Sequence, residues 1–415
     1  MRLADCDVIV TAPPTPGWGG RYWILVKLTT ACGLVGWGEC YAASVGPDAM
    51  RAVIADVFER HMAGADPSDV ELMFHRAYSA GFTQRPDLTV IGAFSGLEIA
   101  CWDILGKSRD VPVHRLMGGR MNDRIRAYTY LYPQDGHPMP EFWASPDMAA
   151  EAAAAMVAKG YTAVKFDPAG PYTIRGGHMP SRFDISLSVA FCAAIREAVG
   201  DRADLLFGTH GQFTPAGAVR LAAALEAFDP LWFEEPVPPD VPGAMAEVVA
   251  KTSIPVATGE RLTTMFEFSQ ALDAGVRILQ PALGRAGGLW QGRKIAALAE
   301  ARRAQMAPHL YAGPVEWAAN IQLCAAIPNL LIAETIETEF HARLIGGANR
   351  VEGGYIEVSD APGLGIEVDE ETARAHPYEG EGLHLEMQED PISYHGINIF
   401  EGGAPAKVDG GDQTG

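Results

Sequence analysis

The chain has 415 residues, of which 48% are hydrophobic and 20% charged, and its formal net charge is −20. This composition is typical of a soluble globular protein with room for one large and one smaller domain. Such an acidic protein has no overall field for holding a phosphate backbone or an anionic membrane, which excludes those partners. The opening MRLADCDVIV carries acidic residues inside its apolar stretch, unlike a signal peptide. We find no run near the roughly 18–20 apolar residues of a membrane span, and expect a cytoplasmic protein.

The first 120 residues predict a small α+β domain. Strand-like runs at 21–30 and 34–40 are joined by a glycine-containing turn. Helical patterns follow at 49–62 and 92–108. These segments share an apolar face, so we expect them to pack together.

Residues 121–340 repeat one pattern, a short β-rich apolar run that ends in polar residues and is followed by an amphipathic helix. Such alternation is typical of parallel βα units. Eight units in this length favour a (β/α)₈ barrel over an open sheet. The expected strands lie at 124–132, 162–167, 203–210, 230–236, 254–260, 277–282, 305–311 and 329–335.

The C-terminal part differs from the barrel pattern. Residues 341–400 contain a strand–turn pattern at 353–371, which we expect to rejoin the first domain. Residues 401–415 hold no apolar residue larger than Val408 and are expected to be disordered.

Polar side chains stand at the ends of most predicted strands. In a (β/α)₈ barrel these ends converge on one mouth, where catalytic groups lie. Carboxylates at two successive strand ends, with Lys and His on other strands, indicate a site for a hard cation surrounded by candidate bases. The residues are Lys165, Asp167, His210, Glu234, Glu235, Glu260, His309 and Glu334.

Each of these residues alone has a structural explanation. A single Glu at a strand end often caps a helix or faces solvent, and Glu235, which precedes Pro236, fits such a role. A single His is most often a hydrogen-bonded packing residue. The coincidence of six such strand ends at one barrel face favours a functional site.

Six short motifs keep their order and spacing along most of the chain. They are VGWGEC at 35–40, ACWDILGK at 100–107, WFEEP at 232–236, ATGER at 257–261, RAGG at 285–288 and APH at 307–309. Together they resemble the enolase superfamily in its mandelate racemase branch, and GER, APH and the Glu334 strand resemble galactonate dehydratase-like proteins. The resemblance implies a modified (β/α) barrel under an N-terminal α+β capping domain that the C-terminal segment completes.

The resemblance also implies a reaction. A base removes the proton α to a carboxylate, Mg²⁺ stabilises the resulting enediolate, and an acid expels a hydroxyl; pairing of a Lys or His base with Mg²⁺ is known for this superfamily. By matching position, Glu234 and Glu260 would bind the metal. Lys165 and His309 would act as base or acid on opposite faces of the substrate. Glu334, if protonated, would donate a hydrogen bond to the substrate carboxylate.

Further residues follow from the same resemblance. His210 matches the general acid of several acid-sugar dehydratases. Capping-domain loops near Trp18 and Tyr41 would set specificity. Arg261 and Arg285 would contact distal substrate oxygens or form structural ion pairs. Family members commonly form octamers or dimers, so a homo-oligomer with a small sugar-acid or hydroxy-acid substrate is implied.

Three positions depart from the family pattern. Glu234 lies 26 residues before Glu260, and one equal step earlier, where a third ligand Asp is expected, stands Gly208. Ala282, in QPA, replaces the Asp that orients the strand-seven His and raises its basicity. Asp167 stands where the branch often has a second Lys.

These departures suggest one rearrangement. Our first hypothesis is that Asp167 completes the metal site that Gly208 leaves open, with His210 or water as alternatives. Loss of the orienting Asp weakens His309 as a base, which leaves Lys165 or His210 as alternative bases.

Three functions remain open from the sequence. The first is dehydration of a sugar acid to a 2-keto-3-deoxy acid, since Lys and His at the mouth offer both a base and a separate acid. The second is racemisation, epimerisation or cycloisomerisation, which needs no leaving-group acid. The third is sugar-acid binding without turnover.

Overall fold

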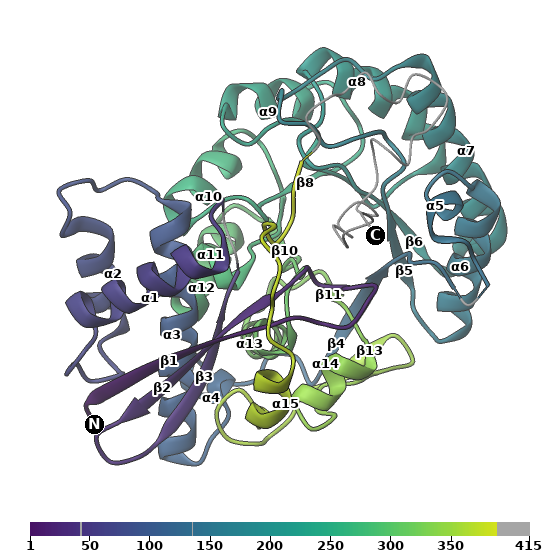
Figure 1. Cartoon of the computed structure of the whole chain (residues 1–415). Helices are drawn as coiled ribbons and strands as arrows, with labels where there is room; N and C mark the ends of the chain where they lie inside the picture. Colours follow the sequence, from purple (N-terminus) through teal and green to yellow (C-terminus); the bar gives the residue numbers. More distant parts are fainter. Residues whose placement is uncertain (42–43, 135, 388–415) are drawn as a thin grey trace.

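The computed structural model describes residues 1–41, 44–134 and 136–387. It has two neighbouring parts (Figure 1). One is a three-stranded antiparallel sheet with helices, and the other is a ten-stranded mixed sheet surrounded by helices.

The smaller part combines a meander with helices packed on it. Its strands are β1 (Leu3–Thr11), β2 (Trp23–Thr30) and β3 (Val35–Cys40). Its helices are α1 (Pro47–His61), α2 (Val70–Ser79), α3 (Leu88–Arg109) and α4 (Val113–Leu116). A Cβ on Gly38 of β3 would lie 1.8 Å from the carbonyl oxygen of Gly96 on α3. The GWG motif therefore lets helix and strand backbones touch.

Helix α3 corrects one expectation from the sequence. It is long and apolar enough to cross a membrane, with a window of mean hydropathy 1.5, although we expected no such run. Of that window, 83% is buried inside the protein. A buried core helix passes the same test of length and composition, and α3 packs on β3, α1 and α11 (Leu283–Ala286).

The larger part contains eight parallel strands in chain order. They are β4 (Arg124–Tyr130), β5 (Ala163–Phe166), β6 (Asp204–Phe207), β7 (Trp232–Glu234), β8 (Val256–Thr258), β9 (Ile278–Leu279), β10 (Gln305–Met306) and β11 (Ala333–Thr335). The last strand, β11, pairs in parallel with the first, β4. Within the described residues, the seventh and eighth are joined only by the bridge Met306–Leu330. The expected closed barrel is thus observed in part, as a ring whose β10–β11 edge lacks a continuous ladder.

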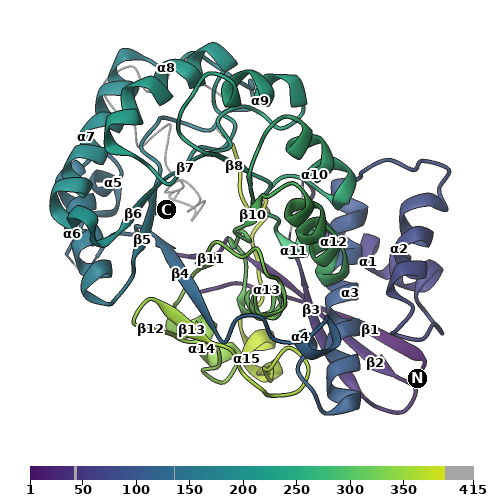
Figure 2. The same cartoon turned by 180° about the vertical axis from the view of Figure 1, so that it is seen from behind.

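Helices lie between these strands along the chain and cover the outside of the sheet (Figure 2). Besides α11, they are α5 (Met139–Phe142), α6 (Pro146–Ala158), α7 (Arg182–Val199), α8 (Pro215–Leu225), α9 (Pro242–Val249), α10 (Thr264–Asp273), α12 (Gly288–Ala301) and α13 (Pro314–Ala326), with 3-10 turns at Gly200–Arg202 and Glu226–Phe228. One side chain from each strand region fills a separate buried cluster: Tyr128, Ala163, Leu206, Trp232, Ala257, Ile278, Ala307 and Ile332. This packed interior is the one a small barrel requires.

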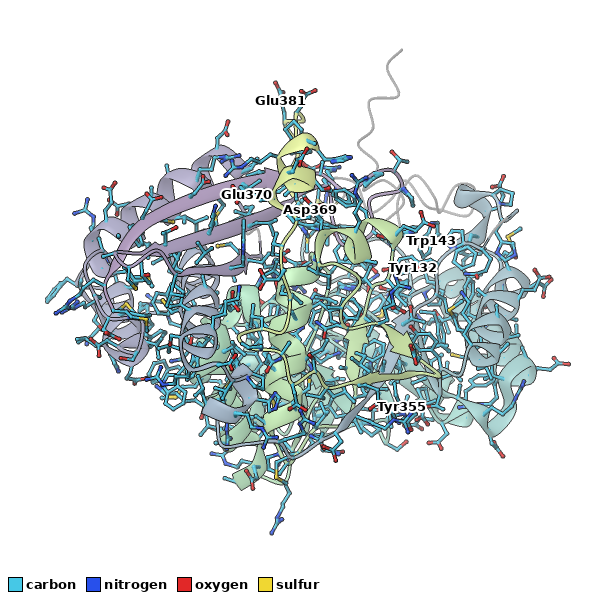
Figure 3. The ribbon with its side chains drawn as sticks, turned by 90° about the horizontal axis from the view of Figure 1, so that it is seen from below. Tyr132, Trp143, Tyr355, Asp369, Glu370 and Glu381 are labelled. Atoms are coloured by element: carbon cyan, nitrogen blue, oxygen red, sulfur yellow. The ribbon has the colours of Figure 1, made fainter. Side chains whose placement is uncertain are left out.

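After β11 the chain first extends the large sheet. Helix α14 (Glu339–Leu344) precedes a hairpin, β12 (Val351–Glu352) and β13 (Tyr355–Glu357), whose second strand pairs antiparallel with β4. The chain then reaches the smaller part, where α15 (Glu370–Ala375) lies beside β1 (Figure 3). There Glu370 forms an ion pair with Lys27 of β2, with Nζ 2.6 Å from Oε2.

All eight predicted barrel strands exist, although each is shorter than its apolar run. Strand β1 was missed, because its acidic residues obscure the pattern in MRLADCDVIV. The 353–371 segment contributes β13 to the barrel sheet before it reaches the small sheet. The domain limits 1–120, 121–340 and 341–400 stay a prediction. The predicted disordered tail, 401–415, lies outside the described residues.

Candidate active site

The predicted site residues converge on one cavity at the carboxyl ends of the strands. Lys165, His210, Glu260, His309 and Glu334 all line it. They come from five different strand ends, which parallel pairing brings to one mouth. The convergence that the sequence predicted is therefore present.

Lys165 lies between two buried carboxylates. Its Nζ is 2.5 Å from Oε1 of Glu234 and 3.5 Å from Oε1 of Glu334, and the residue is 1% exposed. Burial opposes the ammonium charge, but the two carboxylates outweigh it and hold the pKa of Lys165 well above its usual value. Lys165 is therefore charged in the metal-free protein.

Glu334 is poised to exchange a proton near neutrality. Burial raises the pKa of its carboxyl group to about 7, against the opposing charge of Lys165. The backbone N–H of Leu310 donates to its Oε2 at 2.8 Å. A protonated Glu334 has the hydrogen-bond donor that the family role requires.

His210 is held from behind by a carboxylate. Its Nδ1 lies 2.9 Å from Oδ2 of Asp167, and the hydroxyl of Tyr172 donates to the same oxygen. Burial lowers the pKa of His210, but Glu260 and Asp167 outweigh it and raise the pKa to about 9. Its Nε2 faces Oε2 of Glu260 at 3.7 Å.

His309 faces the same carboxylate without such support. Its Nε2 is 3.3 Å from Oε2 of Glu260, while its buried Nδ1 has no hydrogen-bond partner. Burial is the main cause that lowers the pKa of His309 to about 3, so its imidazole is neutral at pH 7. Ala282 stands where the family's orienting Asp is expected.

Three groups lie close enough together that they could hold a metal ion. Ligand atoms of His210, Glu234 and Glu260 all lie within 4.8 Å of one another. Oε2 of Glu260 is buried and accepts no hydrogen bond, which suits a cation. Asp167 is outside this group, because it contacts the far side of His210. The geometry thus favours His210 over Asp167, and direct ligation by Asp167 stays a prediction.

Models of known families match both parts of the chain. The "Mandelate racemase / muconate lactonizing enzyme, N-terminal domain" matches residues 18–118, and "Enolase C-terminal domain-like" matches residues 147–372. The chain belongs to the mandelate racemase/muconate lactonizing enzyme family of the enolase superfamily.

Relatives agree with this membership. A solved mandelate racemase/muconate lactonizing enzyme-like protein from Roseovarius sp. TM1035 is 71% identical, with a TM-score of 0.93, and the match covers 94% of this chain and 99% of that one. A D-xylonate dehydratase from Haloferax volcanii is 35% identical over 386 residues, 91% of each chain. A D-galactonate dehydratase from Ralstonia nicotianae is 34% identical over 363 residues, 84% of this chain and 89% of that one.

The four residues predicted to bind substrate differ in position. Tyr41 lines the cavity, and the Arg285 guanidinium lies 3.9 Å from the centre of its ring. Arg261 is 3.0 Å from Oε2 of Glu235 and also donates to the carbonyl oxygen of His210 at 2.9 Å, so it supports the β6 loop. Their roles toward substrate stay predictions.

Trp18 lies in an aromatic group beside the mouth. Its ring centre is 4.1 Å from that of Tyr132 and 6.4 Å from that of Trp143, and Figure 3 labels these two neighbours. Trp18 is outside the set of cavity-lining residues. Its contact with substrate stays a prediction, and Tyr132 connects it to the cavity wall.

Sequence reasoning missed the aromatic lining and one polar support. The missed lining residues are Tyr130, Tyr132, Tyr172, Tyr311 and Leu385. Tyrosines two residues apart in RAYTYLY, and Tyr311 two residues after His309, were the available signal, since alternate residues of an extended chain share a face. Gln280, the first residue of QPA, donates to Oε2 of Glu234 at 2.7 Å.

A segment near the end of the described chain lies at the cavity and is held in place by residues of the smaller part. Leu385 lines it, and the neighbouring His384 packs its ring 4.8 Å from that of Tyr41. Arg21 binds Glu386 at 2.8 Å. A Cβ on Gly20 would lie 2.0 Å from His384, so only glycine leaves room for this ring.

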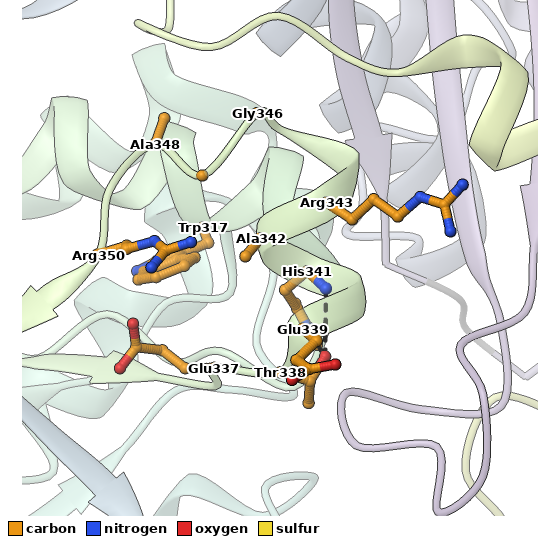
Figure 4. Close-up of a pocket in the computed structure, with 11 residues that line it drawn as sticks. Trp317, Glu337, Thr338, Glu339, His341, Ala342, Arg343, Gly346, Ala348 and Arg350 are labelled. Carbon is orange, nitrogen blue, oxygen red and sulfur yellow. Dashed lines mark hydrogen bonds between the residues drawn. The ribbon is translucent and has the colours of Figure 1, made fainter.

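A second cavity, of about 680 Å³, lies beside helices α13 and α14 (Figure 4). Trp317, Glu337 and Arg350 line it, and His341 contacts the hydroxyl of Thr338 at 2.7 Å there. None of the predicted site residues is among its lining residues. The chemistry predicted from the sequence therefore belongs to the cavity at the strand ends.

Proposed function

We propose that this protein is a hydro-lyase that dehydrates a sugar acid to a 2-keto-3-deoxy acid. In support, relatives of the chain are named as dehydratases of D-xylonate, D-galactonate and D-gluconate. The observation that carries the proposal is a charged Lys165 and a neutral His309 that line the same cavity, with buried carboxylates beside them. Groups whose surroundings push their pKa values apart are natural acid and base partners.

The proposed mechanism begins with proton abstraction α to the substrate carboxylate. His309 is the proposed base, because its imidazole is neutral and its Nε2 faces Oε2 of Glu260 at the cavity. Lys165 is the proposed acid, which protonates the departing hydroxyl. Glu334 in its protonated form would donate a hydrogen bond to the substrate carboxylate, on which negative charge develops in the enediolate.

A divalent cation fits the donors present. Glu234 and Glu260 would hold it together with a third donor, and the family resemblance implies Mg²⁺. When bound, the cation supplies positive charge that stabilises the developing enediolate. The substrate would then be a small anion that a local positive site attracts into an otherwise acidic protein.

A second candidate function is racemisation or epimerisation. It is favoured by the position of His210 in the metal-ligand group, because that leaves Lys165 and His309 as the proton carriers. Two such carriers are sufficient to move one proton between the faces of a carbon atom.

A screen of acid sugars in D₂O with an added divalent cation separates these functions. Dehydration predicts a 2-keto-3-deoxy acid, abolished by EDTA and by His309→Asn. Racemisation predicts deuterium at the α carbon of a recovered substrate epimer. Tight binding with neither product would instead identify a binding protein and overturn both proposals.

A further inference from the structure

We propose that Nε2 of His210 is the third metal ligand, and that this nitrogen donor makes the site prefer a first-row transition-metal ion such as Mn²⁺ over Mg²⁺. The inference rests on the metal dependence proposed above. It concerns which ion the site takes and which atom holds it.

The imidazole of His210 is oriented as a metal ligand. Asp167 engages Nδ1 at 2.9 Å, so the other ring nitrogen, Nε2, points toward Oε2 of Glu260 at 3.7 Å. A carboxylate on one imidazole nitrogen, which fixes the tautomer and frees the other nitrogen, is the usual support of a metal-bound histidine.

The surroundings of His210 hold this orientation. The ring of Tyr172 packs edge-on at 4.5 Å, and its hydroxyl donates to Asp167. The backbone N–H of His210 donates to Gln212 at 3.1 Å, and its carbonyl accepts from Arg261 at 2.9 Å. Both the ring and the loop that carries it are therefore fixed before any ion binds.

Residue 208 has little room for a side chain. A Cβ on Gly208 would lie 3.3 Å from both Cε of Lys165 and the carbonyl oxygen of Phe166, and 3.4 Å from Cβ of Asp167. Even this one atom would need its neighbours to move by a few tenths of an ångström. His210 reaches the same group of carboxylates from two residues further along the loop.

The donor set decides the preferred ion. Mg²⁺ favours oxygen ligands in an octahedral shell and is bound mainly by carboxylates and water. Imidazole instead favours transition metals, whose affinities for a nitrogen-containing site rise from Mn²⁺ through the first row. A site with one nitrogen and two carboxylates therefore discriminates against Mg²⁺ more than an all-carboxylate site does.

The test measures metal binding directly, without activity. Protein stripped with EDTA is titrated with Mn²⁺ and with Mg²⁺ by calorimetry, and the Mn²⁺-loaded form is studied by pulsed EPR for ¹⁴N coupling. Wild type should bind Mn²⁺ with the higher affinity and show coupling to one imidazole nitrogen. His210→Asn should lose the coupling and weaken Mn²⁺ binding by more than about 10-fold.

Matched variants identify the histidine concerned. His309→Asn should keep the coupling, and Asp167→Asn should keep it while weakening Mn²⁺ binding about 10-fold or more. His75→Asn, at an exposed His–Glu pair on α2, is the control and should change neither. In Gly208→Asp/His210→Asn, the preference for Mn²⁺ over Mg²⁺ should fall.

Three outcomes overturn the inference. Coupling that is absent from wild type, or lost in His309→Asn and kept in His210→Asn, removes His210 as a ligand but leaves a metal-dependent enzyme intact. Equal affinities for the two ions in wild type overturn the proposed preference. Failure of wild type to bind either ion overturns the metal dependence of the proposed function as well.

Discussion

His210 and His309 approach the same carboxylate oxygen of Glu260 from two strand ends, at 3.7 Å and 3.3 Å. Behind His210 stands Asp167, whereas Nδ1 of His309 is buried without a partner. The two pKa values move in opposite directions, to about 9 for His210 and about 3 for His309, with burial opposing the rise in the first and causing most of the fall in the second.

The two rings share Glu260 and differ in the group behind them, so the added carboxylate of Asp167 helps to separate their pKa values. In the family pattern an Asp supports the strand-seven histidine, which is His309 in this chain. The position of that Asp is taken here by Ala282. Here the carboxylate stands two residues after Lys165 and supports the strand-three histidine instead. In this chain His210 is therefore the ring with a carboxylate behind it, and His309 is the ring without one.

The largest expected difference between the two histidines is in turnover. His309→Asn should lower kcat about 10²- to 10⁴-fold, the usual contribution of a general base, while Mn²⁺ affinity stays unchanged. Steady-state kinetics on the substrate found in the screen, beside calorimetry on the same preparation, measure both. Loss of metal binding in this variant would show that the two histidines share one role.

The next effect is on stability as a function of pH in metal-free protein. The folded-state pKa of His210, about 9, lies above its ordinary 6.5, so its contribution is fully present below pH 6.5 and is lost as pH rises through 9. The pKa of His309, about 3, is depressed, so its penalty grows as pH falls from 6.5 toward 3. At about 1.36 kcal/mol per pKa unit, these shifts correspond to about 3 kcal/mol for His210 and about 5 kcal/mol for His309.

Urea unfolding in EDTA from pH 4 to pH 9 measures the free energy of unfolding of each variant relative to wild type, and so checks these two opposite pH dependences. His210→Asn should flatten the alkaline side of the profile, and His309→Asn the acidic side. A change on the same side in both variants would contradict the assignment.

A smaller effect should follow from restoring the family's carboxylate. Ala282→Asp should raise the pKa of His309 by about one unit or more, as an adjacent carboxylate does. Because Ala282 is fully buried, a packing penalty of about 1–3 kcal/mol is expected. NMR titration of the histidine ring measures the pKa, and Ala282→Asn reproduces the volume without the charge. An equal pKa in both variants would rule out electrostatic support from this position.

The smallest effect concerns the hydroxyl behind Asp167. Tyr172→Phe removes one hydrogen bond to that carboxylate and should cost about 1 kcal/mol of stability. Mn²⁺ affinity should fall less than in Asp167→Asn, since the carboxylate itself remains. Tyr311→Phe is the control, because Tyr311 lines the same cavity but follows His309 in the chain. A loss as large as that of Asp167→Asn would make Tyr172 the principal support.

The sequence predicted the eight strands and the convergence of their polar ends, because parallel strands place their carboxyl ends together whatever the loops do. It could not decide between Asp167 and His210 as the third metal-ligand candidate. That choice depends on side-chain direction at neighbouring strand ends, which spacing does not contain. The tyrosine lining was missed for a related reason, since a tyrosine in an apolar strand is typical of ordinary packing.

The lining of the cavity has a consequence for biosynthesis. Leu385, which lines the cavity, is among the last described residues to leave the ribosome, whereas Gly20, which lies against His384, is among the first. When Glu234, Glu260 and His309 emerge, Leu385 has yet to be translated. The lining of the cavity is therefore complete only after synthesis has passed residue 385.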